Sequence, residues 1–360
     1  MKLKFSLLLC LVLPLFTFAT NGDVTYKKTI RKEFTVSAGT AFSLSNKYGK
    51  VVFHIWGKNE IKAAITITGF GKNDQEAQGI TESVNIDANQ NGNNVSINTS
   101  YNPSKSGGSW FSWGSKKDSK DYVNIDYDVF IPESLARLRV ENSFGDVVAD
   151  KFNFPAELQL NYCSYDIRDA ADLQLRLNYC DRGRIGKANK VVLKGNYSNL
   201  KAEQLDLLDV NSNYSNYTVT NLGTLKLAAN YDDYKIQRVE KVNGHVAFSD
   251  TNIGDLVTDI SMKVTYGDLN IKKIVPGFKG ADLILTFSDL KLNLPRRLPL
   301  QLDVVIVNGD LSTGGLELKN VNSNKTSSTL IYRAQSGGGS EGSPVIKIKG
   351  TNSDASLNAY

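Results

Sequence analysis

The stretch VLKGNYSNLKAEQLDLLDVNSNYSNYTV, residues 192–219, contains the tetrapeptide Asn-Tyr-Ser-Asn twice. The two copies begin at Asn196 and Asn213, 17 residues apart. A fixed period of this length is typical of repeat proteins, in which each unit packs only against its neighbours. The spacing therefore predicts an architecture built from one repeated unit.

Related segments occur on both sides of this stretch, and we name the position of the tetrapeptide tyrosine the anchor. Successive anchors from Phe144 to Asn308 are 17, 18 or 21 residues apart, and a longer interval of 44 residues precedes Asn352. That interval accommodates two units and an inserted loop. The anchors are Tyr48, Phe144, Tyr162, Tyr179, Tyr197, Tyr214, Tyr231, Phe248, Tyr266, Phe287, Asn308 and Asn352.

The pattern inside each unit is typical of β-strands. Around Tyr231, apolar residues alternate with polar ones at Leu225 and Leu227 and again at Tyr234 and Ile236. Alternation with period 2 indicates strands with one buried face. Each unit thus holds two short strands, and it is too small to bury its apolar face without stacking on its neighbours.

The pattern predicts an all-β, single-chain parallel β-solenoid (β-helix) with one coil per 17–22 residues. Equivalent positions in successive coils then lie about 4.8 Å apart. The anchor aromatics form a ladder, inward or at a corner, that buries a large area in each coil. The residues before the anchors form a side-chain amide ladder, made of Asn161, Asn178, Asn196, Asn213 and Asn230.

Three segments resemble the bacterial putative-adhesin families of exported β-solenoid proteins, whose domains are of unknown function. They are LSNKYGKVVFHIWGKNEIKAAITITG (44–69), VNIDYDVFIPESLARLRVENSFGDVVA (123–149) and VTYGDLNI (264–271). They are similar in having a Gly-Asp turn followed by alternating apolar residues, although Cys, Ser or Asp replaces the glycine in the middle units. The resemblance implies a right-handed solenoid, a cell-envelope location and a non-enzymatic, adhesin-like role, and it brings no catalytic residues.

The N-terminus, MKLKFSLLLCLVLPLFTFA (1–19), has the features of a signal peptide. Lys2 and Lys4 precede an apolar run that is shorter than the roughly 20 residues of a membrane span. Thr17-Phe18-Ala19 fits a cleavage site. We therefore expect export to the periplasm, the cell surface or the medium, with no transmembrane segment after the signal is removed.

Composition divides the mature chain into three regions. We expect residues 20–121 to form irregular coils with a short helix at 73–84 and a loop at 100–121, and residues 122–315 to form regular repeats. Residues 316–360 are C-terminal coils with a Gly/Ser-rich insertion. We expect the last residues, 345–360, to return as the final coil and cover the open end of the solenoid.

Charge and motifs exclude several classes of function. The net charge of +5 is thinly spread, which gives no reason to expect nucleic acid. Only His54 and His245 are present, and Gly-x-Ser-x-Gly, His-Glu-x-x-His and phosphate-binding glycine loops are absent. The sequence thus predicts no catalytic residues, no cofactor and no metal site.

The loop at 100–121 carries the predicted ligand-binding residues. Aromatic side chains in a polar loop can stack on sugar rings or cover a partner's apolar patch, and nearby lysines can contact acidic glycans. The alternative is that the loop folds back over an edge of the solenoid. The candidate residues are Trp110, Phe111, Trp113, Lys116 and Lys117.

We name a set of equivalent positions in successive coils a column. The residues in two such columns have alternative interpretations. Cys163 and Cys180 lie one coil apart, where an exported protein can form a disulfide although its dihedral is hard to reach between adjacent strands. Two residues after the anchors, aspartates form a column that either binds Ca²⁺ or caps the turns. Asn199 and Asn216 in that column favour capping. The aspartates are Asp146, Asp181, Asp233, Asp250, Asp268, Asp289, Asp310 and Asp354.

The sequence therefore predicts a non-enzymatic cell-envelope or secreted protein, adhesin-like, that binds or scaffolds and contacts polysaccharide or another cell-surface component through the aromatic loop. One alternative is a structural or sensory envelope protein without a small ligand. Another is a polysaccharide-degrading β-helix enzyme, whose acids and bases would lie on a coil face.

Overall fold

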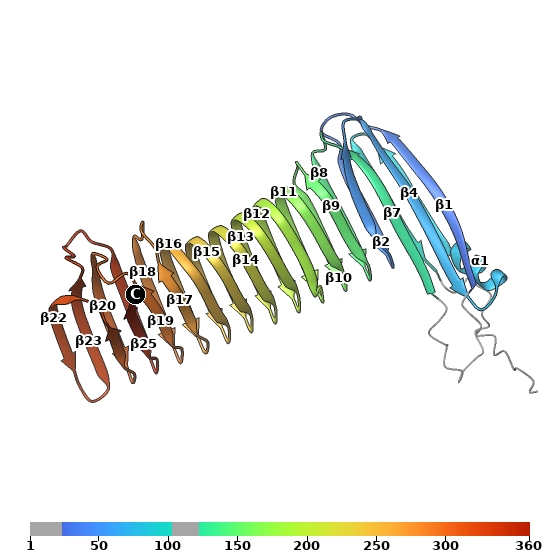
Figure 1. Cartoon of the computed structure of the whole chain (residues 1–360). Coiled ribbons are helices and arrows are strands. Elements are labelled where there is room, and N and C mark those ends of the chain that lie inside the picture. Colours follow the sequence, from blue (N-terminus) through green and yellow to red (C-terminus); the bar gives the residue numbers. More distant parts are fainter. Residues whose placement is uncertain (1–23, 103–121) are drawn as a thin grey trace, which may run out of the picture.

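The computed structural model describes residues 24–102 and 122–360, and these are almost entirely β-structure. Its 25 strands join into one long, open sheet that extends from the N-terminal strands to the C-terminal ones (Figure 1). The all-β prediction is confirmed. The predicted signal peptide, residues 1–19, lies outside the described residues.

The centre of the protein is a stack of long strands that pair in parallel in chain order. Each is joined to the next by a short turn that contains an anchor, and we name one such strand with its turn a rung. These strands are β11 (Ser164–Asn178), β12 (Arg182–Asn196), β13 (Asn199–Asn213), β14 (Asn216–Asn230), β15 (Asp233–Ala247) and β16 (Asp250–Thr265).

Each rung must bend back on itself. A straight strand of 15 residues would end about 50 Å from its start, too far for a short turn to reach the beginning of the next parallel strand. The pairing of β11 with β12 is interrupted after Ile167 and after Ala170, which marks the bend. Each rung therefore contributes its first half to one face of the stack, the first face, and its second half to the opposite, second face.

The rungs at both ends of the stack show the two faces as separate strands. The first half of β11 pairs with β9 (Asp146–Phe152) and the second half with β10 (Ala156–Asn161). In the same way β16 is followed by β17 (Leu269–Ile274) on the first face and β18 (Gly280–Thr286) on the second. The two short strands expected in each unit thus join into one bent strand through the middle of the stack.

The core lies between the two faces. Inward residues such as Ile167, Leu175 and Leu193 are at most 1% exposed and alternate with exposed polar ones. Four tyrosines among the described residues are also buried in the core, Tyr127, Tyr165, Tyr217 and Tyr234. A Cβ at Gly183 would overlap the ring of Tyr165, so glycine is needed where this large ring meets the neighbouring rung.

Strands in both parallel and antiparallel pairing, together with a helix, extend the N-terminal end. The first face continues from β9 through β3, β7, β4 and β1, and the second from β10 through β8, β2, β6 and β5. These strands are β1 (Val24–Thr35), β2 (Ala41–Lys47), β3 (Val51–Trp56), β4 (Glu60–Gly71), β5 (Val84–Asn91), β6 (Asn94–Tyr101), β7 (Tyr122–Pro132) and β8 (Arg137–Ser143).

Helix α1 (Asp74–Glu82) packs against β4 and β1, and it confirms the short helix expected at 73–84. Asn73 is its N-cap, and the side chain accepts a 2.9 Å hydrogen bond from the backbone N–H of Glu76. Among the described residues, no helix has the length and apolar character needed to cross a membrane.

The C-terminal segment does not cover the open end, contrary to the sequence-based expectation. β24 (Val345–Thr351) lies between β18 and β20 (Leu300–Val307), and β25 (Ala355–Ala359) lies between β19 (Leu290–Leu294) and β21 (Leu311–Gly314). After β19 the chain leaves one strand position of the stack unoccupied and continues as β20. The last residues of the chain, in β24 and β25, fill that position. On the second face the end is instead formed by β23 (Thr329–Ser336) and β22 (Leu318–Lys325), antiparallel to their neighbours.

The anchors share a backbone conformation that explains the repeat. All twelve predicted anchors have positive φ, between 50° and 65°. Non-glycine residues, and bulky ones above all, seldom adopt this left-handed conformation, which costs free energy unless the surroundings enforce it. The anchor is therefore the residue at which every rung reverses direction into the next.

The residue after each anchor is small, and from Cys163 to Ser249 it is buried and belongs to an internal hydrogen-bonded column. The backbone N–H of Cys180 donates to Ser198 Oγ at 3.1 Å, and that of Ser198 donates to Ser215 Oγ at 3.1 Å. The N–H of Ser215 donates to Asp232 Oδ1 at 2.8 Å. The Cys, Ser and Asp that replace the turn glycine in the middle units thus belong to the fold.

The disulfide considered for Cys163 and Cys180 is not formed, and both are buried free thiols. Each Sγ lies 3.3–3.5 Å from backbone carbonyls, those of Asn142 and Asn161 for Cys163. Side chains in one column of a parallel stack point the same way, which disfavours the crossed geometry of a disulfide. Burial raises the pKa of the Cys180 thiol to about 11.

We predict that Ser198→Ala lowers the free energy of unfolding by about 1–3 kcal/mol, because the buried N–H of Cys180 loses its acceptor. Ser198→Cys, which repeats the residue found at Cys163 and Cys180, should be milder. Urea denaturation of both variants measures the difference. Equal stability of the alanine variant and the unmodified protein would contradict a role for the internal column.

Candidate functional site: an exposed aromatic ladder

An unbroken row of stacked rings runs along one edge of the stack. From Phe144 to Phe287, neighbouring ring centroids are 4.8–5.1 Å apart and the ring planes differ by at most 7°. Tyr48 extends the row, 5.4 Å from Phe144. We name this row the aromatic ladder; its members are Tyr48, Phe144, Tyr162, Tyr179, Tyr197, Tyr214, Tyr231, Phe248, Tyr266 and Phe287.

The aromatic ladder lies at the corner of the rungs and is half exposed. Its members from Phe144 to Phe287 are 47–53% accessible to solvent. This corrects the expectation that the ladder adds a large buried area. The rings cover one another's faces and present their outer edges to solvent, because the left-handed backbone directs the anchor side chain out of the turn.

An amide ladder runs beside the rings, as predicted. The side chain of each asparagine before an anchor donates to the one in the preceding rung. The Nδ2–Oδ1 distances are 3.0 Å from Asn178 to Asn161, 3.3 Å from Asn196 to Asn178, and 3.2 Å from Asn213 to Asn196. Because an amide has two N–H groups, each member uses only one of them in this row.

A carboxylate column follows the rings on their other side. Asp250 Oδ1 accepts the backbone N–H of Asp268 at 2.9 Å, and Asp268 Oδ1 accepts that of Asp289 at 3.2 Å. In the same way, Asp289 Oδ1 accepts the backbone N–H of Asp354, and Asp354 Oδ1 accepts that of Asp310. These carboxylates therefore cap the turns of neighbouring rungs. The part of the chain that the structure describes holds no group of three or more potential metal ligands.

The sequence-predicted loop residues Trp110, Phe111, Trp113, Lys116 and Lys117 lie outside the described residues. The described strand that leads to the loop ends at Tyr101, and this ring meets the first ladder ring, Tyr48, edge-on at 6.2 Å. The described strand thus ends next to the aromatic ladder. Sequence reasoning found the anchors but missed their exposure, because alternation alone does not tell a buried side chain from one at a corner.

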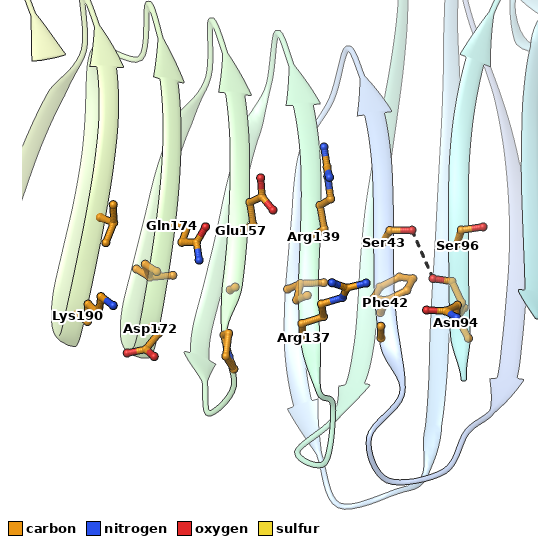
Figure 2. A pocket seen from close by; sticks show the side chains of 17 residues that line it. Phe42, Ser43, Asn94, Ser96, Arg137, Arg139, Glu157, Asp172, Gln174 and Lys190 are labelled. Atoms are coloured by element: carbon orange, nitrogen blue, oxygen red, sulfur yellow. Dashed lines mark hydrogen bonds between the residues drawn. The ribbon is translucent and has the colours of Figure 1, made fainter. Parts of the chain in front are cut away.

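A groove of about 410 Å³ lies on the second face. It is at the beginning of the second-face strands such as β8 and β10, whereas the aromatic ladder follows their ends. Figure 2 shows Arg137, Arg139, Glu157 and Asp172 projecting from neighbouring strands along it. Charges of both signs at an accessible surface suit a polar ligand held by hydrogen bonds. The groove would have been hard to find from sequence, since its residues come from six strands spread over residues 41–192.

Asp232 is the buried carboxyl group of the internal column, 1% exposed. It accepts hydrogen bonds from the Ser212 hydroxyl, the Ser215 backbone N–H and, at 3.0 Å, the Tyr234 hydroxyl. Burial raises the pKa of Asp232, and these donors partly offset that effect. The group is enclosed in the core, so it affects stability and not ligand contact.

No family model matches the chain, and neither does any curated protein. Solved structures that resemble it include putative adhesins from Parabacteroides merdae (13% identity, 71% of this chain and 92% of that one, TM-score 0.36) and Parabacteroides distasonis (11%, 71% and 93%, 0.33). A third is a putative lipid binding protein from Parabacteroides distasonis (12%, 71% and 93%, 0.34). The first two bear the name of the family that the sequence segments resemble. Similarity of this extent carries no argument about function.

We predict that Asp232→Asn changes the pH dependence of stability. The folded-state pKa of Asp232 lies above that of the unfolded chain, about 3.9, so the folded protein binds more protons above that pH. The free energy of unfolding therefore falls as the pH rises through this window. Urea titrations from pH 3 to 8 should show this fall in the unmodified protein and a weaker one in Asp232→Asn. Parallel curves would contradict the assignment.

Proposed function

We propose that this chain is an exported, non-enzymatic, adhesin-like protein of the cell envelope that binds extended polysaccharide along the aromatic ladder. In this proposal it is a right-handed parallel β-solenoid with coils of 17–22 residues. It comprises a signal peptide (1–19), irregular coils (20–121), regular coils (122–315) and C-terminal coils (316–360). The observation that carries the proposal is the unbroken, half-exposed row of rings from Phe144 to Phe287.

The chemistry of the three rows suits a sugar polymer. Sugars offer apolar C–H surface together with many hydroxyl groups, and aromatic edges flanked by amides and carboxylates complement both. The spacing of the rings, 4.8–5.1 Å, is close to the length of one sugar residue in an extended chain. A polymer that lies along the ladder makes the same contact many times, so that weak contacts add up to useful avidity.

The aromatic loop extends this surface in our proposal. Trp110, Phe111 and Trp113 would contact the same ligand, and Lys116 and Lys117 would favour acidic glycans. The described end of β6 supports this, because Tyr101 touches the first ring of the ladder.

A structural or sensory envelope protein without a small ligand is the second candidate. One observation favours it: the rings stack on one another, and such pairs stabilise a fold by about 0.5–1.5 kcal/mol each beyond the area that they bury. A polysaccharide-degrading enzyme has less support, since the aspartates Asp250, Asp268 and Asp289 are already engaged by backbone N–H groups.

We predict that Tyr197→Asn/Tyr214→Asn weakens polysaccharide binding at least tenfold. Asparagine stands at the same left-handed position in Asn308 and Asn352, so the backbone should tolerate the change. Tyr197→Phe/Tyr214→Phe is the matched control, because it keeps the stacked rings and removes only the hydroxyl groups. Co-sedimentation with a panel of insoluble polysaccharides measures binding, and circular dichroism checks the fold.

Retained binding in the phenylalanine variant would assign the contact to the ring edges, and loss in both would assign it to the hydroxyls. Trp110→Ala/Trp113→Ala in the same assay tests the loop separately. If no polysaccharide of the panel binds the unmodified protein, while the asparagine variant is merely less stable, the scaffold function replaces the adhesin-like one.

A further inference from the structure

The C-terminal segment, residues 345–360, occupies an internal position of the stack. β24 pairs with β18 over Gly280–Thr286 on one side and with β20 on the other, and β25 pairs with β19 and β21 in the same manner. Figure 1 shows the C-terminus among these strands and not at the end of the array. We name the position that the segment fills the strand slot.

Three of the four strands that form the walls of the strand slot have partners of their own on their far sides. On one wall, β18 pairs with β16 and β19 with β17. On the other wall, β20 pairs with β23, which in turn pairs with β22. Residues 295–299 connect the walls directly. On the second face, β18 and β20 therefore keep hydrogen-bonded neighbours whichever polypeptide supplies the strand between them, and on the first face β19 does so, whereas β21 pairs with β25.

The segment fits the strand slot through the same columns as an ordinary rung. Ile346, Ile348 and Leu357 are fully buried. Ser353 Oγ accepts the backbone N–H of Ser288 at 3.1 Å, which continues the internal column. Asp354 donates its N–H to Asp289 Oδ1 at 3.1 Å and accepts the N–H of Asp310 at 2.8 Å, which continues the carboxylate column.

A short tether holds the segment to the rest of the chain. It is GGGSEGSP, residues 337–344. Ser336 pairs with Leu300 and Val345 with Gln301 on the opposite edges of β20, so the tether crosses two interstrand distances, about 9.6 Å. Gly337 and Gly338 have positive φ, and a Cβ at Gly337 would overlap the backbone of Arg297. Glycine is thus needed for the close crossing.

We propose that residues 345–360 are an exchangeable strand, and that the strand slot of one copy accepts this segment from a second copy. Reciprocal exchange of an identical element joins two chains at low cost, because the bonds formed are those already present within one chain. A second copy is the partner that fits, since its segment supplies Ser353, Asp354 and the buried Ile346 and Ile348 in the register that the walls require.

Shortening the tether tests the proposal. Deletion of residues 337–343 leaves only Pro344 between Ser336 and Val345, and two Cα–Cα steps reach at most about 7.6 Å. The segment then cannot enter its own strand slot, so we expect a dimer or a closed larger assembly, with at least twice the monomer mass by light scattering and an unchanged circular dichroism spectrum. Deletion of 338–341 leaves five steps, about 19 Å, and should stay monomeric. A folded monomer from the longer deletion, with a protease-sensitive C-terminus, would overturn the proposal.

A second experiment applies even if the deletion variant fails to fold. In this experiment a protease site is introduced into the full chain between Gly338 and Gly342. The protein is allowed to fold and is then cut at this site. A fluorescent peptide of residues 345–360 should replace the cut segment at urea concentrations below global unfolding, and a peptide with Ile348→Asp should not. Release of the cut segment only together with global unfolding would overturn the exchange. Neither experiment depends on polysaccharide binding.

Discussion

Because the rungs pair in parallel and in register, each side chain lies about 4.8 Å from its counterpart in the next rung. This single constraint converts a sequence period into straight rows on the surface and in the core. It explains why identical residues recur: asparagine amides bond to one another only when they face one another, as Asn196 and Asn213 do. It also brings like groups together, which requires that carboxylates such as Asp268 receive backbone N–H groups as partners.

The left-handed anchor makes such close stacking possible. A chain that passes from one rung to the next within two or three residues must reverse sharply, and positive φ at the anchor achieves this. The following residue is then forced into the crowded interior, where only Gly, Cys, Ser or Asp is found. The strain at the anchor is offset by the stacked rings and by the internal column, and the same geometry turns the rings outward. Stability and surface chemistry are thus coupled at one residue of each rung.

Two features of this stack have consequences beyond folding. The aromatic ladder offers a repeated surface that suits a repeated ligand, and its length, from Tyr48 to Phe287, exceeds what a small molecule would need. The strand slot is filled by the last residues of the chain, although its walls are built by earlier ones. The first feature concerns a ligand along the edge, and the second concerns a second copy at one end of the array.

The sequence by itself determined the all-β class, the position of every anchor, the amide ladder and the short helix after Asn73, because each depends on local spacing or on capping by a neighbouring residue. Only the tertiary structure decided what depends on distant parts of the chain or on the direction of a side chain. Alternation gave no sign of whether Tyr197 is buried or exposed, since this follows from its φ angle. The sequence predicted that Cys163 and Cys180 occupy equivalent positions in adjacent coils, but their unpaired state follows from the direction in which the thiols point. The insertion of β24 between β18 and β20 has no local signal at all, because it joins residues more than 40 positions apart through backbone bonds that any strand can make.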